Sequence, residues 1–224
     1  MADQKTEQKY TVDDFAGAIS AAMPKLDLTD QQISTEIYQL MSGGEAVDPA
    51  DVARNLGVPV ELVNARLDSW PGVYRDPAGR VVGFWGQALE KVEAEYRFQV
   101  DGNTTFAWCA LDTLFIPKIL DKTVLVEASD PVTGEPVTLV VHPDGVRDLR
   151  PAGAVVSMVV PDAPFGYDVI EAFCSRVFFF ASEATGAKWA AEHPGTTILS
   201  VDDAFQVGRV ATERTRPDLF GKKG

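Results

Sequence analysis

The spacing of apolar residues changes from a helical to an extended period near residue 92 of this 224-residue chain. Before that point, Ile33, Ile37 and Met41 recur at the interval of a helix face. After it, short runs such as Glu95–Val100 alternate between apolar and polar residues, as strands do. Helices followed by a series of short strands are typical of the α+β class. We therefore expect an N-terminal three-helix part packed on a C-terminal core with a mixed or antiparallel sheet and flanking helices.

Three short helices and a hairpin are predicted within residues 29–91. Pro49 and Pro59 indicate the starts of the second and third helices. Val73–Arg75 and Val81–Trp85 then flank a tight turn, which predicts a β-hairpin. This order of elements is typical of a winged-helix module, and such modules often bind DNA.

The charge of the chain argues against DNA binding. Residues 48–70 hold four acidic and only two basic side chains, so a recognition helix there would repel phosphate. Over the whole chain 33 acidic residues exceed 20 basic ones, giving a net charge of −13. We expect no nucleic-acid partner, and we favour a packing or lid role for the winged-helix-like part.

Composition predicts four successive regions. Residues 1–28 are expected to be a leader, partly disordered, because the start of the chain is polar. Residues 29–91 are the winged-helix-like domain, and residues 92–211 are an α+β core. Residues 212–224 are predicted to be a polar tail.

Within the core, the predicted helices and strands follow from the periods of the apolar residues. The strands are Glu95–Val100, Val124–Glu127, Val137–His142, Ala154–Val160 and Val177–Ala181, and the helices cover about 108–119, 167–173, 186–193 and 202–209.

The chain has only two cysteines and two histidines. Two cysteines are too few for a disulfide framework or a four-cysteine zinc site, and two histidines are too few for a histidine-rich metal site. No apolar run has the length of a membrane span or a signal peptide, so we expect no membrane association and a cytoplasmic protein. Both thiols are then expected to be reduced.

The surroundings of the two cysteines make them the candidate site. Cys109 lies in an apolar segment with Asp112 three residues on, so a helix there would bring the thiol and the carboxyl into contact range. Cys174 lies beside Phe173 and before a run of three phenylalanines. A buried core thiol is the simpler interpretation of each cysteine. Asp112 argues against it, because a carboxyl in an apolar segment is costly unless it is paired, exposed or kept protonated.

These three residue types suit a soft metal. Two thiolates with one proton donor, and no oxygen-rich or histidine-rich ligand set, favour a metal that accepts sulfur ligands. In a dry site the pKa of Asp112 would rise, which makes it a candidate general acid. From the residues alone, we predict a thiol-based site for a soft metal and no resident cofactor.

Three sequence blocks resemble the bacterial organomercurial lyases, also called alkylmercury lyases. They are Phe-Ala-Trp-Cys-Ala-Leu-Asp-Thr-Leu at 106–114, Arg-Pro-Ala-Gly-Ala-Val-Val-Ser-Met-Val-Val at 150–160, and Ala-Phe-Cys-Ser-Arg-Val-Phe-Phe-Phe-Ala-Ser at 172–182. The likeness extends from about residue 30 to about residue 210. It implies protonolysis of a carbon–mercury bond, in which an organomercurial cation and a proton give a hydrocarbon and Hg²⁺.

The resemblance also implies roles for the candidate residues. Cys109, Cys174 and Asp112 match the catalytic set of the family and would bind mercury as substrate and product. We expect the Cys109 thiolate to attack first, Asp112 to take its proton, and Asp112 to return that proton to the departing carbon. The resemblance makes residues 92–211 the catalytic core.

Four aromatic residues near these positions are expected to wall the substrate pocket. They are Phe106, Trp108, Phe173 and Phe178. The chain departs from the family pattern at Phe106, where some relatives have Tyr, and at Ser175, where some have a further Cys.

Two functions follow from these observations. The first is the lyase, with a small organomercurial substrate, excess cellular thiol for turnover, and hand-off of Hg²⁺ to a mercuric reductase. The second is a non-catalytic protein of the same fold that binds or senses a soft metal, mercury or copper. The role of Asp112 separates them, because only the lyase needs a proton donor.

Overall fold

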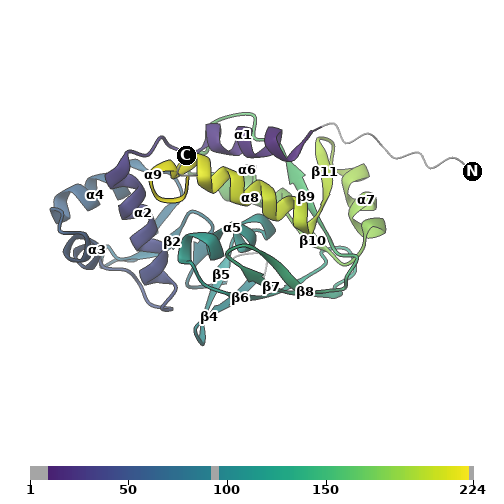
Figure 1. Cartoon of the computed structure of the whole chain (residues 1–224), viewed down its shortest axis with the longest axis horizontal. Helices are drawn as coiled ribbons and strands as arrows, with labels where there is room; N and C mark the ends of the chain where they lie inside the picture. The colour runs from purple at the N-terminus through teal and green to yellow at the C-terminus, as the bar shows by residue number, and fades with distance from the viewer. Residues whose placement is uncertain (1–9, 92–95, 222–224) are drawn as a thin grey trace, which may run out of the picture.

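The structure is a computed structural model, and it describes residues 10–91 and 96–221. The chain begins with four helices, as Figure 1 shows in purple and blue. These are α1 (Val12–Ala22), α2 (Leu28–Met41), α3 (Pro49–Leu56) and α4 (Val60–Ser69). Gly57 ends α3 with a φ of 68°, and Pro59 precedes α4. The predicted three helices are therefore confirmed as α2, α3 and α4, and the winged-helix arrangement stays a prediction.

Eight strands form one antiparallel sheet in the order β1-β2-β3-β5-β4-β6-β7-β8. They are β1 (Val73–Arg75), β2 (Val81–Phe84), β3 (Gln87–Ala88), β4 (Tyr96–Val100), β5 (Asn103–Ala107), β6 (Val124–Ser129), β7 (Pro136–His142) and β8 (Gly145–Arg150). Since β3 pairs with β5, the predicted hairpin region and the predicted core share one sheet. The α+β fold class is confirmed, with antiparallel pairing throughout the described strands.

A second antiparallel sheet has the order β10-β9-β11 and lies with α7 at the end of the molecule opposite α3 and α4 (Figure 1). Its strands are β9 (Val155–Val159), β10 (Phe179–Phe180) and β11 (Thr196–Ser200). The remaining helices are α5 (Ala110–Leu120), α6 (Val169–Ala172), α7 (Glu183–Glu192), α8 (Val201–Thr215) and α9 (Pro217–Phe220). The predicted strand over Val177–Ala181 is only two residues long, and β8 and β11 were not predicted.

Helix α8 packs closely on α5 because of a glycine. Buried residues of α8 recur at helical spacing, among them Ala204, Val207 and Ala211. A Cβ at Gly208 would lie 2.9 Å from Cβ of Phe115 on α5, so glycine permits the close approach of the two helices. This packing brings the last two turns of α8 to the functional site described below.

Both chain ends contain helices that the sequence analysis did not predict. Residues 12–22 of the predicted leader form α1, which lies along α8 in Figure 1 and buries Phe15 and Ile19. The polar start of the chain, on which the prediction rested, precedes this helix. The predicted tail continues α8 and adds α9, and its Arg216 is only 2% exposed. Residues 1–9 lie outside the described residues.

In the part of the chain that the structure describes, no helix combines the length and the apolar character that crossing a membrane requires.

Candidate active site

Cys109 and Asp112 are brought together by the start of α5. Cys109 follows β5 with an extended backbone (φ −149°) and is the N-cap residue of the helix. Asp112 lies in the first turn, and its Oδ2 accepts a hydrogen bond of 2.9 Å from the backbone N–H of Cys109. The predicted contact is confirmed, but it arises from the helix cap and not from two side chains on one helix face. The positive end of the helix dipole also favours negative charge at this point.

Cys174 reaches the same place from a distant segment. It begins a 3-10 helix, Cys174–Arg176, directly after α6. The carbonyl oxygen of Val177 accepts hydrogen bonds from the backbone N–H of Ala110 (3.1 Å) and from the Tyr96 hydroxyl (3.3 Å). These bonds fix the cysteine segment against the start of α5.

The three side chains form one compact cluster. The Cys174 Sγ lies 4.0 Å from Oδ2 of Asp112, and one ligand atom from each of Cys109, Asp112 and Cys174 lies within 4.8 Å of the other two. Within residues 10–91 and 96–221 it is the one such group of three or more His, Cys, Asp or Glu. Two sulfurs and one carboxylate oxygen at this separation can share one soft metal ion.

Burial controls the protonation of the cluster. Cys109 is fully buried, and Cys174 and Asp112 are 4% and 7% exposed. Burial raises the pKa of Asp112 from 3.8 to about 7, although hydrogen bonds from Cys109 oppose the rise. Burial also raises the pKa of Cys109 well above 9.0. A hydrogen bond from Cys109 favours the Cys174 thiolate, but burial and the Asp112 carboxylate outweigh it and raise that pKa as well.

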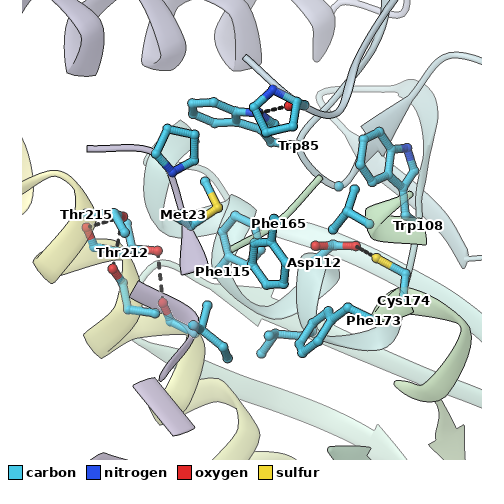
Figure 2. Close-up of a pocket in the computed structure, with 18 of the residues that line it drawn as sticks. Met23, Trp85, Trp108, Asp112, Phe115, Phe165, Phe173, Cys174, Thr212 and Thr215 are labelled. Atoms are coloured by element: carbon cyan, nitrogen blue, oxygen red, sulfur yellow. Dashed lines mark hydrogen bonds between the residues drawn. The ribbon is translucent and has the colours of Figure 1, made fainter. Parts of the chain in front are cut away.

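An apolar cavity opens onto one side of the cluster (Figure 2). Its volume of about 80 Å³ is several times the ~10–15 Å³ that one water needs, so it has room for a small organic group. Cys174 and Asp112 line it, whereas Cys109 does not. Figure 2 shows Asp112 and Cys174 close together, with Phe173 and Trp108 near them.

Two of the four predicted aromatic residues line this cavity, and two do not. Trp108 and Phe173 are in the wall. Phe106 is not among the lining residues, because successive side chains of β5 alternate and those of Thr105 and Ala107 are the fully buried ones. Phe178 is absent from the wall too, since its ring packs edge-on against Trp189 at 5.5 Å. The structure therefore places Phe106 and Phe178 outside the wall of this cavity.

Several lining residues were not predicted from the sequence. Met23 follows α1, Phe165 precedes α6, and Arg216 follows α8. Gly86 lies directly against the cluster: its φ is 100°, and a Cβ there would lie 2.4 Å from Oδ1 of Asp112. The Trp85-Gly86 step after a predicted strand was the available signal for a close backbone approach.

Ser175, where some family members carry a cysteine, is turned away from the cluster. Its side chain is exposed, and its Oγ donates a hydrogen bond of 2.5 Å to the carbonyl oxygen of Glu171. The site therefore contains two thiols and no third, and neither histidine lines the cavity.

Comparison with known proteins gives one consistent result. The family model described as alkylmercury lyase (MerB) matches residues 89–213. An alkylmercury lyase of Bacillus cereus is 42% identical over 178 residues, which is 80% of this chain and 79% of that protein. One from Pseudomonas putida is 35% identical over 184 residues, covering 82% of this chain and 84% of the relative.

A solved structure shows the same fold. The crystal structure of the mercury-bound form of MerB2 superposes with a TM-score of 0.69 at 22% sequence identity. The match covers 91% of this chain and 98% of that one.

Proposed function

The chain belongs to the alkylmercury lyase family, and we propose that Cys109, Asp112 and Cys174 carry out its reaction, the cleavage of a carbon–mercury bond to give a hydrocarbon and Hg²⁺. One observation supports this assignment above the others. Two buried thiols and one buried carboxyl lie within 4.8 Å of each other, and two of the three groups face an apolar cavity. The organomercurial is a small molecule that such a cavity can receive.

The geometry favours Cys174 as the first residue to bind mercury. Cys174 lines the cavity, and a hydrogen bond from Cys109 partly offsets the burial that raises the pKa of the Cys174 thiol. Cys109 does not line the cavity, and burial keeps the Cys109 thiol protonated. This order is the reverse of the one expected from the sequence. In the first step the Cys174 thiol gives its proton to the small thiolate that carries the organomercurial, the bond between that carrier sulfur and mercury breaks, and Cys174 forms the new sulfur–mercury bond.

The second step moves a proton from Cys109 to Asp112. Mercury bound to Cys174 lowers the pKa of a second thiol that approaches it, because the metal stabilises the thiolate. Asp112 has a pKa of about 7 and accepts a hydrogen bond from the backbone of Cys109, so it is placed to accept this proton. Cys109 then binds the mercury as a second thiolate, and both sulfur ligands push electron density toward the bound carbon.

The third step returns the proton. The protonated Asp112 donates it to the carbon, the carbon–mercury bond breaks, and the hydrocarbon leaves with that proton while Hg²⁺ stays on the two thiolates. Apolar walls exclude water and so keep the carboxyl protonated until this step. A soft-metal binder or sensor needs only the two sulfurs and has no use for Asp112, a buried carboxyl that is costly to retain.

Release of the product is proposed to need other molecules. Excess cellular thiol removes Hg²⁺ from Cys109 and Cys174, and we propose hand-off to a mercuric reductase as the next step. A cytoplasmic location suits this scheme, since both cysteines of the cluster must be reduced to work. No cofactor is required, because the thiols and the carboxyl supply every group that the reaction uses.

Gas chromatography of benzene released from phenylmercury tests the assignment. With excess 2-mercaptoethanol, the wild type is expected to release benzene, and Cys109→Ala and Cys174→Ala are expected to release none while keeping the wild-type circular dichroism spectrum. Phe178→Leu is a matched control, because Phe178 is near the cysteines in sequence but packs on Trp189 outside the cavity. A wild type that binds phenylmercury and releases no benzene over hours would show that the assignment is wrong.

A further inference from the structure

Arg216 is a buried cation in the wall of the cavity. It ends α8, is 2% exposed, and lines the same cavity as Asp112 and Cys174. In Figure 2, Thr212 and Thr215 of the last turn of α8 lie on the opposite side of the view from Asp112 and Cys174. The end of α8 therefore faces the cluster across the cavity.

The guanidinium has few partners for a buried charge. Nη1 donates to Oγ1 of Thr215 at 3.4 Å, and the group lies 5.6 and 5.7 Å from the centres of the Tyr38 and Trp85 rings. Nε and Nη2 have no hydrogen-bond partner. Among the described residues, no carboxylate forms an ion pair with Arg216.

The two guanidinium nitrogens without a hydrogen-bond partner indicate the kind of ligand that Arg216 could bind. Nε and Nη2 form one edge of the guanidinium, and that edge matches the two oxygens of a carboxylate in the bidentate geometry that arginine prefers. A buried charge without a counter-ion is costly, and burial lowers the pKa of Arg216 although its interaction with the Tyr38 hydroxyl opposes the fall. Retention of such a group in a cavity that is otherwise mainly apolar indicates an anionic ligand that completes it.

We propose that Arg216 binds a carboxylate carried by the organic group of the substrate, at the end of the cavity away from the mercury. This inference rests on the proposed function, because it takes the substrate to be bound through mercury at Cys174. An arylmercurial with a carboxylate on its ring has both features: the ring packs between the apolar walls, and its carboxylate pairs with the free edge of the guanidinium. The protein then selects acidic organomercurials over neutral ones.

The test compares kcat/KM for 4-carboxyphenylmercury with kcat/KM for phenylmercury, which is the same ring without the charge. With neutral 2-mercaptoethanol as the thiol, the wild type is expected to prefer the carboxylated substrate by about tenfold or more. Arg216→Gln is expected to lose that ratio. Arg216→Lys keeps the charge but removes the bidentate edge, so an intermediate ratio is expected. A wild type with no preference, or an Arg216→Gln variant that keeps the wild-type ratio, overturns the proposal.

Two controls make the outcome specific. Arg214→Gln removes an exposed arginine of the same helix that pairs with Asp13, and it is expected to keep the wild-type ratio. The second control replaces 2-mercaptoethanol by mercaptosuccinate, whose carboxylates travel on the thiol instead. If mercaptosuccinate raises kcat/KM for phenylmercury, and a carboxylate on the ring has no effect, then Arg216 binds the carboxylate of the thiol that carries the mercurial. That result would show that the proposal is wrong.

Calorimetry with benzoate tests the same subsite without turnover. The wild type is expected to bind benzoate, and Arg216→Lys is expected to bind it about tenfold more weakly. Failure of the lyase assay with retained benzoate binding would refute the proposed function and leave the subsite in place. Equal benzoate binding by both proteins would refute the subsite, whatever the turnover.

Discussion

Replacing Asp112 by Asn removes the titrating group of the cluster and keeps its shape. The Asn side-chain oxygen can still accept the hydrogen bond from the backbone N–H of Cys109. Because the wild-type carboxyl is buried, its pKa is about 7 in the folded protein against an ordinary value of 3.8. The variant is therefore expected to be inactive and, at neutral pH, more stable than the wild type.

The size of the gain follows from proton linkage. Above pH 3.8 the unfolded chain loses the proton of Asp112 while the folded protein keeps it up to about pH 7. The free energy of unfolding of the wild type therefore falls as the pH rises through this range and is constant above it. At about 1.4 kcal/mol per pH unit the whole effect is about 4 kcal/mol, of which about 2 kcal/mol falls between pH 5.5 and pH 8. Asn does not titrate, so the variant lacks this fall.

Urea unfolding at pH 5.5 and at pH 8 measures the difference. The stability advantage of Asp112→Asn over the wild type is expected to be about 2 kcal/mol larger at pH 8. Asp14→Asn is the matched control: Asp14 has the same position in the first turn of α1, but it is exposed, and hydrogen bonds from Thr11 lower its pKa. That variant is expected to be less stable than the wild type by the same amount at both pH values. An Asp112→Asn advantage that does not change with pH would refute a protonated Asp112.

The remaining predictions concern the approach to the cluster and the order of the thiols. Gly86→Ala places a Cβ 2.4 Å from Oδ1 of Asp112, so the rate of benzene release is expected to fall at least about tenfold. Gly79 also has a positive φ but no neighbour within 4 Å of an added Cβ, so Gly79→Ala is the control and is expected to keep wild-type turnover. Iodoacetamide is expected to alkylate Cys174 before Cys109, as peptide mass spectrometry measures, because only Cys174 lines the cavity. Equal turnover in the two glycine variants, or earlier alkylation of Cys109, would contradict the geometry described here.

Local sequence patterns predicted several helices and strands and the contact between Cys109 and Asp112. The alternation of apolar residues located β6 and β7, and the proline and glycine signals located α3. The spacing of Cys109 and Asp112 predicted their contact, since a helix cap depends only on residues a few positions apart. Cys174 was a candidate because the chain has only two cysteines, but its place beside Cys109 could not be predicted, because long-range pairing leaves no trace in local periodicity.

The far wall of the cavity could not be predicted in this way. The end of α8 has a polar composition, so it was assigned to a tail, and the apolar stripe that buries it is interrupted by Thr212 and Arg216. The register of β5 determines which side of the sheet Phe106 occupies, and β5 itself was not predicted. Burial of Arg216 depends on the packing of α8 against α5 and on the contact of Arg216 with the Tyr38 ring of α2, which only the tertiary structure reveals.

Native mass spectrometry after a single turnover tests the central claim that Asp112 delivers the proton to mercury-bound carbon. The wild type and Asp112→Asn are each mixed with one equivalent of phenylmercury in the absence of free thiol. The wild type is expected to carry Hg²⁺ without the phenyl group, and Asp112→Asn is expected to carry phenylmercury with its carbon–mercury bond intact. An Asp112→Asn protein that loses the phenyl group as benzene at the wild-type rate would contradict the account.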